Sequence, residues 1–579
     1  MKVLIAKTAG FCMGVRRAVE LALDAPSKFE KPIYTYGPLI HNPQVLELFA
    51  EKGISTLQQI PEKSSGTVLV RAHGVPPETK STLKQAGFHV VDATCPRVIR
   101  VQTIIRSHAA NGYATIIIGD ADHPEVVGLR GFAGRKGHVA ASAKDLDALP
   151  DFDKAIIVAQ TTQNMALYDE IKQWALHKHP HYKVFDTICG STERRQAEVK
   201  ALAEVVDAIV VVGGRNSGNT QRLAEIARQA GKPAFHVETE NELDLQQLGR
   251  YVTVGLTAGA STPNWIINRV YRQLEHLPIR KRSQWVKALL ALQRTLLLTN
   301  LYVALGAGCL AYAGALLQGF RSQLSQVLMA VLYVLSMHIL NHLTGRDEDR
   351  FNDPDREQFY QQYKIPLTGL AFIAGAGGLI IAVSQGLWAF LILLWMSVTG
   401  LSYNLRLIPR RGAGVPAYRG LRDIPGSKTI LIAVAWGVVT TLLPAMSPAG
   451  ECGLATLLVF LWSTSTVFVR TAFFDLLDTQ GDRIVGKETI ALLLGEARSL
   501  KLLKSVLAIS LMLLVVPTLL HITTPLGYAL TVCPLFLWLI LSVHQKGEML
   551  PGVRLEFLAE TLFVMAGAAA FIWSSFRSL

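Results

Sequence analysis

The stretch VLIAKTAGFCMGVRRAVELAL (residues 3–23) contains a short apolar run, a polar turn with one cysteine, and then a helical pattern. Two later stretches, HVVDATC (89–95) and KVFDTIC (183–189), repeat this order, and each is again followed by a helical pattern. Self-similarity of this kind indicates repeated structural units. We therefore expect three similar units, each presenting one cysteine where a strand passes into a helix.

The remainder of residues 1–278 has the same rhythm. Apolar runs such as TIIIG (115–119) and AIVVVGG (208–214) alternate with helical patterns. This alternation is typical of an α/β fold with parallel sheet. We expect residues 1–278 to form one α/β domain whose three units converge on a single site.

The composition changes beyond this domain. Half of the 579 residues are hydrophobic, and a mean hydropathy of +0.30 is too high for a wholly soluble chain. Residues 279–294 form a basic amphipathic stretch typical of a segment that meets an anionic membrane surface, and we assign them as a linker. Residues 295–579 are predicted to form an all-α polytopic membrane domain of about nine transmembrane helices. The nine apolar segments are 296–318, 323–343, 365–384, 387–403, 427–446, 452–473, 501–521, 524–543 and 556–575.

The positive charges indicate how this domain lies in the bilayer. The formal net charge is +13, and the basic excess is greater in the apolar second half. Nearly all loop Lys and Arg fall in 344–364, 404–426, 474–500 and 544–555, which the positive-inside rule places in the cytoplasm. We expect a multi-pass protein of the inner (cytoplasmic) membrane with residues 1–278 in the cytoplasm. The charge suits a lipid bilayer, and nothing in the sequence requires a nucleic acid.

The six cysteines occur singly, without a CxxC pair, so disulfides are not expected. Cys12, Cys95 and Cys189 lie in turn-like settings beside Gly, Pro and Thr. Three thiolates from three loops suit a [4Fe-4S] cluster with one iron free for substrate. Zinc is the alternative metal, although it would need a fourth ligand. A single cysteine is more often an ordinary buried side chain.

Nine short motifs in order carry a resemblance to a known family. The first half is similar to the 4-hydroxy-3-methylbut-2-enyl diphosphate reductases, the LytB/IspH family, over essentially all of residues 1–278. The resemblance implies a [4Fe-4S] cluster on Cys12, Cys95 and Cys189, and a ferredoxin or flavodoxin type electron donor. It also implies the last step of the non-mevalonate isoprenoid route, which gives isopentenyl and dimethylallyl diphosphates. The motifs are GFCMGVRRAV, HNPQV, RAHGV, DATCP, DADHPEV, QTT, DTICGSTERRQ, RNSGNTQRL and TAGAST.

Reductive removal of an allylic hydroxyl needs two electrons and two protons, delivered away from bulk water. Glu125 in HPEV is the expected acid, and Thr161 in QTT is expected to relay the proton or orient the acid. An iron-sulfur sensor is the alternative class for this half. A sensor would need the three cysteines but not Glu125 or a diphosphate site.

A diphosphate needs cations and hydrogen-bond donors. Protonated imidazoles are expected from His41, His73 and His123, which lie in loop-like settings. Hydroxyl, amide and backbone donors at strand-to-helix junctions are expected from Ser217, Asn219 and Ser261. Many family members carry a second Ser where this chain has Gly218, so we expect a modest loss of affinity there.

The second half, from about residue 290 to the end, is similar to the UbiA-type intramembrane prenyltransferases. The loop segments SYNLRLIPRRG (402–412) and LRDIPGSKTILIAVAWG (421–437) look like that family's loop between its fourth and fifth spans. Its second acidic motif is intact, whereas its first has lost two of three carboxylates, with Asp347 and Glu348 nearby. The second motif is Asp475, Asp478, Gly481 and Asp482, and the first reads Asn341, His342, Gly345 and Asp349.

An active second half would bind an isoprenoid diphosphate through Mg²⁺ and transfer the prenyl group to an acceptor that the sequence does not identify. Arg and Lys in the 404–428 loop would help to hold the diphosphate. The competing hypothesis is an inactive membrane scaffold or anchor for the reductase. The Mg²⁺ ligands expected in the active case are Asp475, Asp478, Asp482, Asn341 and Asp349.

Overall fold

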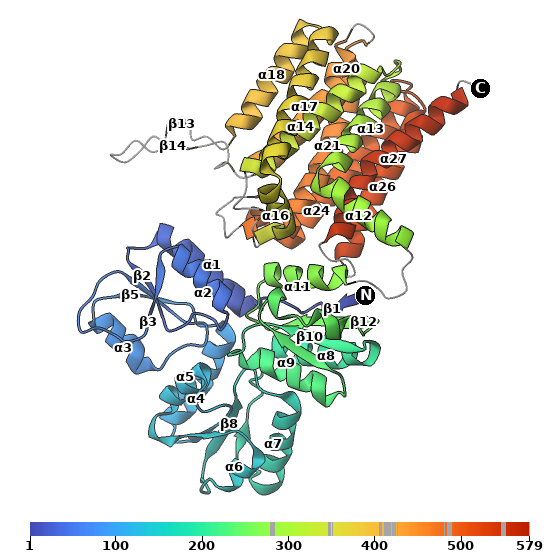
Figure 1. Ribbon diagram of the computed structural model, residues 1–579. Coiled ribbons are helices and arrows are strands. Elements are labelled where there is room, and N and C mark those ends of the chain that lie inside the picture. The colour runs from blue at the N-terminus through green and yellow to red at the C-terminus, as the bar shows by residue number, and fades with distance from the viewer. Residues whose placement is uncertain are drawn as a thin grey trace. The chain divides into compact units, whose positions relative to one another are not determined.

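The computed structural model separates into two compact units, Met1–Lys281 and Arg282–Leu579 (Figure 1). Each unit is described by itself. The described residues are 1–277, 284–344, 349, 351–403, 408–409, 418–419, 424, 426–447, 450–479, 481–482, 489–545 and 552–577.

The first unit contains three four-stranded sheets in which every strand pair is parallel. Central strands such as β4 (Thr67–Val70), β8 (Ala155–Ala159) and β10 (Ala208–Val212) are buried along their whole length. Burial on both faces is typical of parallel sheets that are covered by helices. The predicted α/β class with three similar units is confirmed.

The three sheets share one strand order: β3-β2-β4-β5, β7-β6-β8-β9 and β11-β10-β12-β1. The second and third units are continuous in sequence. The first repeat is split in sequence. Its strand β1 comes from the start of the chain and completes the sheet formed by β10, β11 and β12, which lie within residues 208–258. Its elements are β1 (Lys2–Ile5), α1 (Met13–Lys28), β10, α9 (Gly218–Gln229), β11 (Ala234–Val237), η2 (Glu240–Glu242), α10 (Leu245–Leu248), β12 (Thr253–Ala258) and α11 (Asn264–His276).

The two continuous units each run from strand to strand through helices and end in the helix that follows a cysteine. The second unit comprises β2 (Ile33–Tyr36), α2 (Pro43–Glu51), β3 (Ile54–Leu57), β4, α3 (Pro77–Gln85), β5 (His89–Asp92) and α4 (Pro96–Ala110). The third comprises β6 (Ala114–Ile118), α5 (Pro124–Ala133), η1 (Gly134–Lys136), β7 (Gly137–Ala140), α6 (Ala143–Asp147), β8, α7 (Met165–Lys178), β9 (Lys183–Val184) and α8 (Gly190–Val205).

The C-terminal compact unit, Arg282–Leu579, is mostly helical. A short strand pair, β13 (Ile408–Pro409) and β14 (Tyr418–Arg419), is its exception among the described residues. Its helices are α12 (Gln284–Leu298), α13 (Leu301–Gln318), α14 (Leu324–Thr344), α16 (Pro354–Gln362), α17 (Lys364–Gln385), α18 (Leu387–Ser402), α19 (Ser427–Gly437), η4 (Val438–Leu442), α20 (Leu443–Ala445), α21 (Leu454–Leu477), α23 (Ile490–Leu494), α24 (Glu496–Leu519), α25 (Leu526–Leu530), α26 (Val532–Gln545) and α27 (Val553–Arg577).

Within the described residues, eight helices are long and apolar enough to cross a membrane. The predicted segment 387–403 is instead a shorter apolar helix, Leu387–Ser402. Large apolar side chains on α17 and α18 face outward, and Trp395 is 70% exposed. Apolar surface of this extent is expected where lipid covers a helix. The predicted helical, multi-pass membrane domain is confirmed apart from the short strand pair, and α12 begins inside the predicted linker 279–294.

Buried charges hold the last helix of this unit. From α27, Glu556 accepts a hydrogen bond from Arg356 Nη2 at 2.5 Å, and Glu560 pairs with Arg470 of α21. Charged side chains inside a membrane domain are costly unless they are paired. These pairs tie α27 to α16 and α21.

Candidate active site

The three cysteines occupy equivalent positions in the three units. Each is the N-cap residue of a helix: Cys12 of α1, Cys95 of α4 and Cys189 of α8. Their backbone N–H groups donate to the carbonyls of Ala260, Ala72 and Thr161 at 3.1, 2.9 and 2.9 Å. Each of these carbonyls follows the strand beside the cysteine's own strand. The repeat in the sequence therefore reflects one backbone arrangement used three times.

All three cysteines are free thiols and line a single cavity. Burial raises the pKa of the Cys95 thiol, and the charges of Cys12 and Cys189 raise it further because they lie nearby. A Cβ atom at Gly14 would overlap the Cys95 sulfur, so glycine keeps this space open. Three converging thiols without disulfide partners fit an iron-sulfur cluster.

Glu125 lies in the same cavity and is only 1% exposed. Its carboxylate accepts hydrogen bonds from the backbone N–H of Thr161 at 2.6 Å and from Thr161 Oγ1 at 2.8 Å. Burial raises the pKa of Glu125, while the Thr161 hydrogen bonds and Arg222 partly oppose the shift. A buried carboxyl with a raised pKa can keep a proton near neutral pH, as a general acid must.

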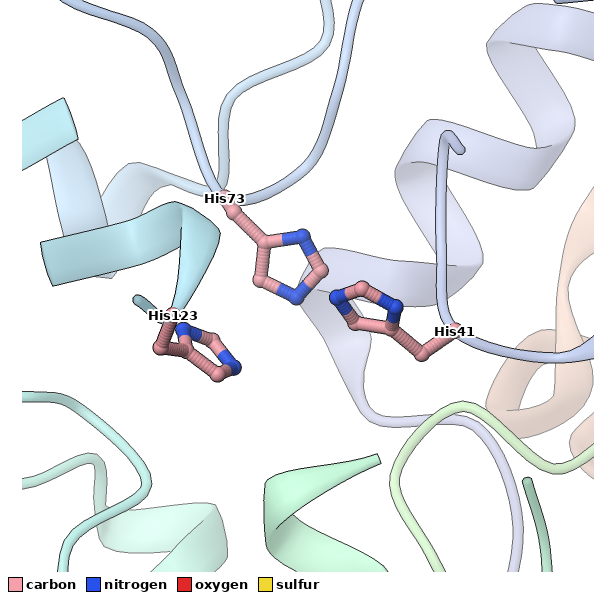
Figure 2. A group of neighbouring side chains, drawn as sticks. All are labelled: His41, His73 and His123. Atoms are coloured by element: carbon pink, nitrogen blue, oxygen red, sulfur yellow. The ribbon is translucent and has the colours of Figure 1, made fainter. Parts of the chain in front are cut away.

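Three histidines come together from separate loops. Figure 2 shows the rings of His41, His73 and His123 side by side, with centroids 4.8, 5.9 and 5.4 Å apart. One ring nitrogen from each lies within 4.8 Å of the others. Two ring nitrogens, Nε2 of His41 and Nδ1 of His73, are buried without a hydrogen-bond partner among the described residues. Unpartnered buried donors of this kind fit a bound anion.

The surroundings of these rings lower their pKa values. Burial lowers the pKa of all three, and proximity to other imidazoles or to Arg71 lowers it further; that of His123 falls to about 4. These shifts favour neutral rings at pH 7 in the ligand-free site, so the expected protonated imidazoles stay a prediction for the site with its anion bound. A bound diphosphate would favour their protonation.

The remaining predicted substrate residues gather at the start of α9. Ser261 Oγ donates to the backbone carbonyl of His41 at 3.2 Å and to Ser217 Oγ at 3.4 Å. Asn219 Nδ2 is buried without a partner among the described residues. A Cβ at Gly218 would lie 3.5 Å from Arg222 Nη1 and 3.7 Å from His123 Cδ2, so a serine has room there.

One cation beside this site was missed from the sequence. Arg222 is 9% exposed, pairs with Asp120 at 2.8 Å and donates to the carbonyl of Thr162 at 3.1 Å. It lies in the RNSGNTQRL motif, one helical turn after Asn219. That spacing on α9 was the available signal, because residues three apart share a helix face.

The two predicted acidic segments of the membrane unit meet. Asn352 Nδ2 donates to Asp482 at 3.1 Å, which joins the segment after α14 to the segment after α21. Asp475 accepts a hydrogen bond from Thr429, and Asp478 caps the end of α21. His342 Nδ1 lies 2.8 Å from Asp349, so the histidine at the position of a missing carboxylate contacts the remaining acid.

A cavity of about 270 Å³ lies beside these segments and is mostly apolar. Its polar lining includes His338, Asn341, Tyr403 and Lys428. Among the described residues, none of the four predicted aspartate ligands lines it. Gly345, Asp347, Glu348 and most of the 404–428 loop lie outside the described residues.

The architecture is that of a three-unit α/β domain with a cysteine-lined cavity, followed by a polytopic helical domain. Residues 3–275 match the family model described as LytB protein, and residues 285–550 match that of the UbiA prenyltransferase family. The chain belongs to the LytB family through its first half. Its second half is UbiA-like.

A reductase of known function supports the activity that the motifs indicate, and two solved structures are similar to one half of the chain each. The 4-hydroxy-3-methylbut-2-enyl diphosphate reductase of Opitutus terrae is 43% identical over 289 residues, which cover 48% of this chain and 100% of the relative. The solved E-1-hydroxy-2-methyl-but-2-enyl-4-diphosphate reductase of Plasmodium falciparum is 28% identical, covering 48% of this chain and 89% of that chain, with a TM-score of 0.47. A UbiA homolog from Aeropyrum pernix is 18% identical, covering 46% and 97%, with a TM-score of 0.38.

Replacing Gly14 should disturb the cysteine site selectively. We expect Gly14→Ala to lower the stability of the apoprotein by about 1–3 kcal/mol, as overpacking does, and to lower iron content after reconstitution, because the new methyl group displaces the Cys95 sulfur. Denaturant unfolding and iron analysis measure both effects. Gly190→Ala is the matched control, since a Cβ there approaches only Arg194 Nη1, at 4.0 Å. Equal iron content in the two variants would contradict the expectation.

Proposed function

We propose that residues 1–278 catalyse the reductive dehydroxylation of (E)-4-hydroxy-3-methylbut-2-enyl diphosphate to isopentenyl and dimethylallyl diphosphates. The observation that carries the proposal is one cavity that combines three thiols, three histidines and the buried Glu125. A binding module or sensor has no need of a buried acid beside an anion site. Anaerobic turnover of this diphosphate by the full-length chain tests the proposal.

Each group of residues has a distinct task. Cys12, Cys95 and Cys189 would hold a [4Fe-4S] cluster, which when bound supplies electrons and a Lewis-acidic iron for the substrate hydroxyl. The histidines, with Ser217, Asn219 and Ser261, bind the diphosphate. Ser217 and Asn219 lie at the start of α9, which adds backbone N–H donors.

Glu125 holds one of the two protons that the reaction consumes. Thr161 Oγ1, 2.8 Å from the carboxylate, can pass a proton from Glu125 toward the substrate. The two Thr161 hydrogen bonds fix the carboxyl orientation, and burial keeps bulk water from competing for the proton.

Diphosphate binding should take up protons. The histidines are neutral in the free site because their pKa values are lowered. The bound anion raises these pKa values, so the complex holds more protons than its separate parts, and affinity should strengthen as the pH falls from 8 to 7. Isothermal titration calorimetry at pH 7 in buffers of different ionisation enthalpy counts the protons. We expect net uptake that His73→Asn reduces; zero uptake by the wild-type chain would contradict this role.

Electrons would come from a ferredoxin or flavodoxin type donor. We place the protein in the inner (cytoplasmic) membrane, with residues 1–278 in the cytoplasm and residues 279–294 as the linker. This placement brings the cluster site to the compartment of such donors, and the basic loops support it.

We further propose that residues 295–579 carry a Mg²⁺-dependent prenyl transfer to an acceptor yet to be identified. The meeting of the two acidic segments at Asn352 and Asp482 favours this over an inactive scaffold, since a diphosphate-bound Mg²⁺ needs oxygen ligands from both. The apolar cavity beside them would take the prenyl chain. The proposed Mg²⁺ ligands are Asp475, Asp478, Asp482, Asn341 and Asp349.

A further inference from the structure

Arg195 lies in the second turn of α8, the helix that Cys189 caps. Its side chain is buried, with 3% of the residue exposed. Nη2 donates to the carbonyl of Gly10 at 2.6 Å, and Nη1 donates to the carbonyl of Ala258 at 3.0 Å. Gly10 lies two residues before Cys12. Ala258 ends β12, the strand that pairs with β1 ahead of the Cys12 loop. One guanidinium thus joins the helix of one cysteine to the loop of another.

The positive charge of Arg195 has no ion-pair partner among the described residues. Within the described chain, no carboxylate lies within ion-pair distance of Arg195, and its buried Nε has no hydrogen-bond partner. Both of its acceptors are neutral carbonyls. Arg222, which is similarly buried, pairs with Asp120 instead. A buried charge is costly unless an opposite charge compensates it, so the site of Arg195 requires negative charge from another source.

The nearby negative groups are Glu198 and the cysteines of the cavity. Burial lowers the pKa of Arg195, whereas the charges of Cys12, Glu198 and Cys189 oppose that shift. The Glu198 carboxylate already accepts hydrogen bonds from the backbone N–H groups of Lys7 and Thr8 and from Thr8 Oγ1. The Cys12 and Cys189 thiolates that would hold the cluster therefore supply compensating charge together with Glu198.

We propose that Arg195 is the fixed counter-charge of the cluster site and that it raises the reduction potential of the cluster. The inference rests on the proposed function of Cys12, Cys95 and Cys189 as ligands. The net charge around an iron-sulfur cluster helps to set its potential. A nearby cation favours the state with one more electron, so Arg195 makes the cluster easier to reduce. It is a positioning residue as well, because it also fixes the Cys12 loop.

The test separates the effect of the Arg195 charge from the effect of its hydrogen bonds to the Gly10 and Ala258 carbonyls. The full-length protein is reconstituted anaerobically with iron and sulfide. The reduction potential of its cluster is then measured by a redox titration followed by electron paramagnetic resonance. Arg195→Met and Arg195→Gln remove the charge, whereas Arg195→Lys keeps it and loses the forked contact with two carbonyls. Arg194→Gln removes an exposed arginine from the same helix and is the matched control.

We expect Arg195→Met and Arg195→Gln to shift the potential to more negative values, while Arg195→Lys and Arg194→Gln stay near wild type. A wild-type potential in Arg195→Gln, or a shift in Arg195→Lys as large as that in Arg195→Gln, would overturn the proposal. If Arg195→Met does not fold, the comparison of Arg195→Gln with Arg195→Lys decides. The potential is measured without substrate, so a chain that holds a cluster but does not turn over substrate contradicts the proposed function alone. A wild-type chain that takes up no cluster overturns both.

Discussion

Glu125→Gln should abolish turnover while the cluster stays in place. The amide keeps the shape of the side chain but cannot deliver the proton, and a positioned general acid contributes about 10²–10⁴-fold to rate. We expect a loss of that size in kcat, with an unchanged iron content and an unchanged absorption spectrum. Steady-state kinetics under anaerobic conditions measures the loss.

Asp122→Asn is the matched control for this variant, because Asp122 is an exposed carboxylate three residues before Glu125, just ahead of α5. Its kcat should stay at the wild-type value. Thr161→Val should fall between the two, since it removes the hydroxyl but leaves the backbone N–H that contacts Glu125. A Glu125→Gln variant with wild-type kcat would exclude Glu125 as the acid.

The double variant Asp475→Asn, Asp478→Asn should eliminate prenyl transfer by the membrane unit. Metal ions supply several kcal/mol of charge stabilisation, so loss of two ligands should cost at least about a hundredfold in rate. Membranes that carry the full-length protein are incubated with Mg²⁺, a lipid extract and labelled prenyl diphosphates of several lengths. We expect a labelled lipid in the wild type that is missing from the variant.

The matched control is Glu451→Gln, an exposed carboxylate outside both acidic segments, which should keep full activity. Reductase activity in the same membranes reports on folding of the other half. No labelled lipid at any chain length, despite an active reductase, would favour the scaffold alternative.

Local patterns predicted much of the first half. The repeated strand, turn and cysteine identified three equivalent positions, because a cysteine at a strand-to-helix turn leaves a local sequence pattern. The split of the first unit did not show in this way, since β1 pairs with β12 only through long-range contacts. Hydropathy likewise located the membrane helices, including the predicted segment 387–403, which forms the 16-residue helix α18.

The site chemistry depended more on tertiary structure. The motifs named the three histidines, but their lowered pKa values arise from burial and mutual proximity, which a sequence does not show. The roles of Arg195 and Arg222 were hidden for the same reason, because their partners lie in other elements. In the membrane unit, His342 contacts Asp349 within the altered first motif, a contact that the sequence did not predict.

The most direct measurement is anaerobic turnover by the purified, cluster-reconstituted full-length protein. The protein is given (E)-4-hydroxy-3-methylbut-2-enyl diphosphate and a reduced low-potential donor, and the products are separated by mass spectrometry. We expect isopentenyl and dimethylallyl diphosphates from the wild type and neither from Cys95→Ser. A wild-type protein that holds its cluster, binds the diphosphate and still forms neither product would contradict the assignment of this half as a reductase.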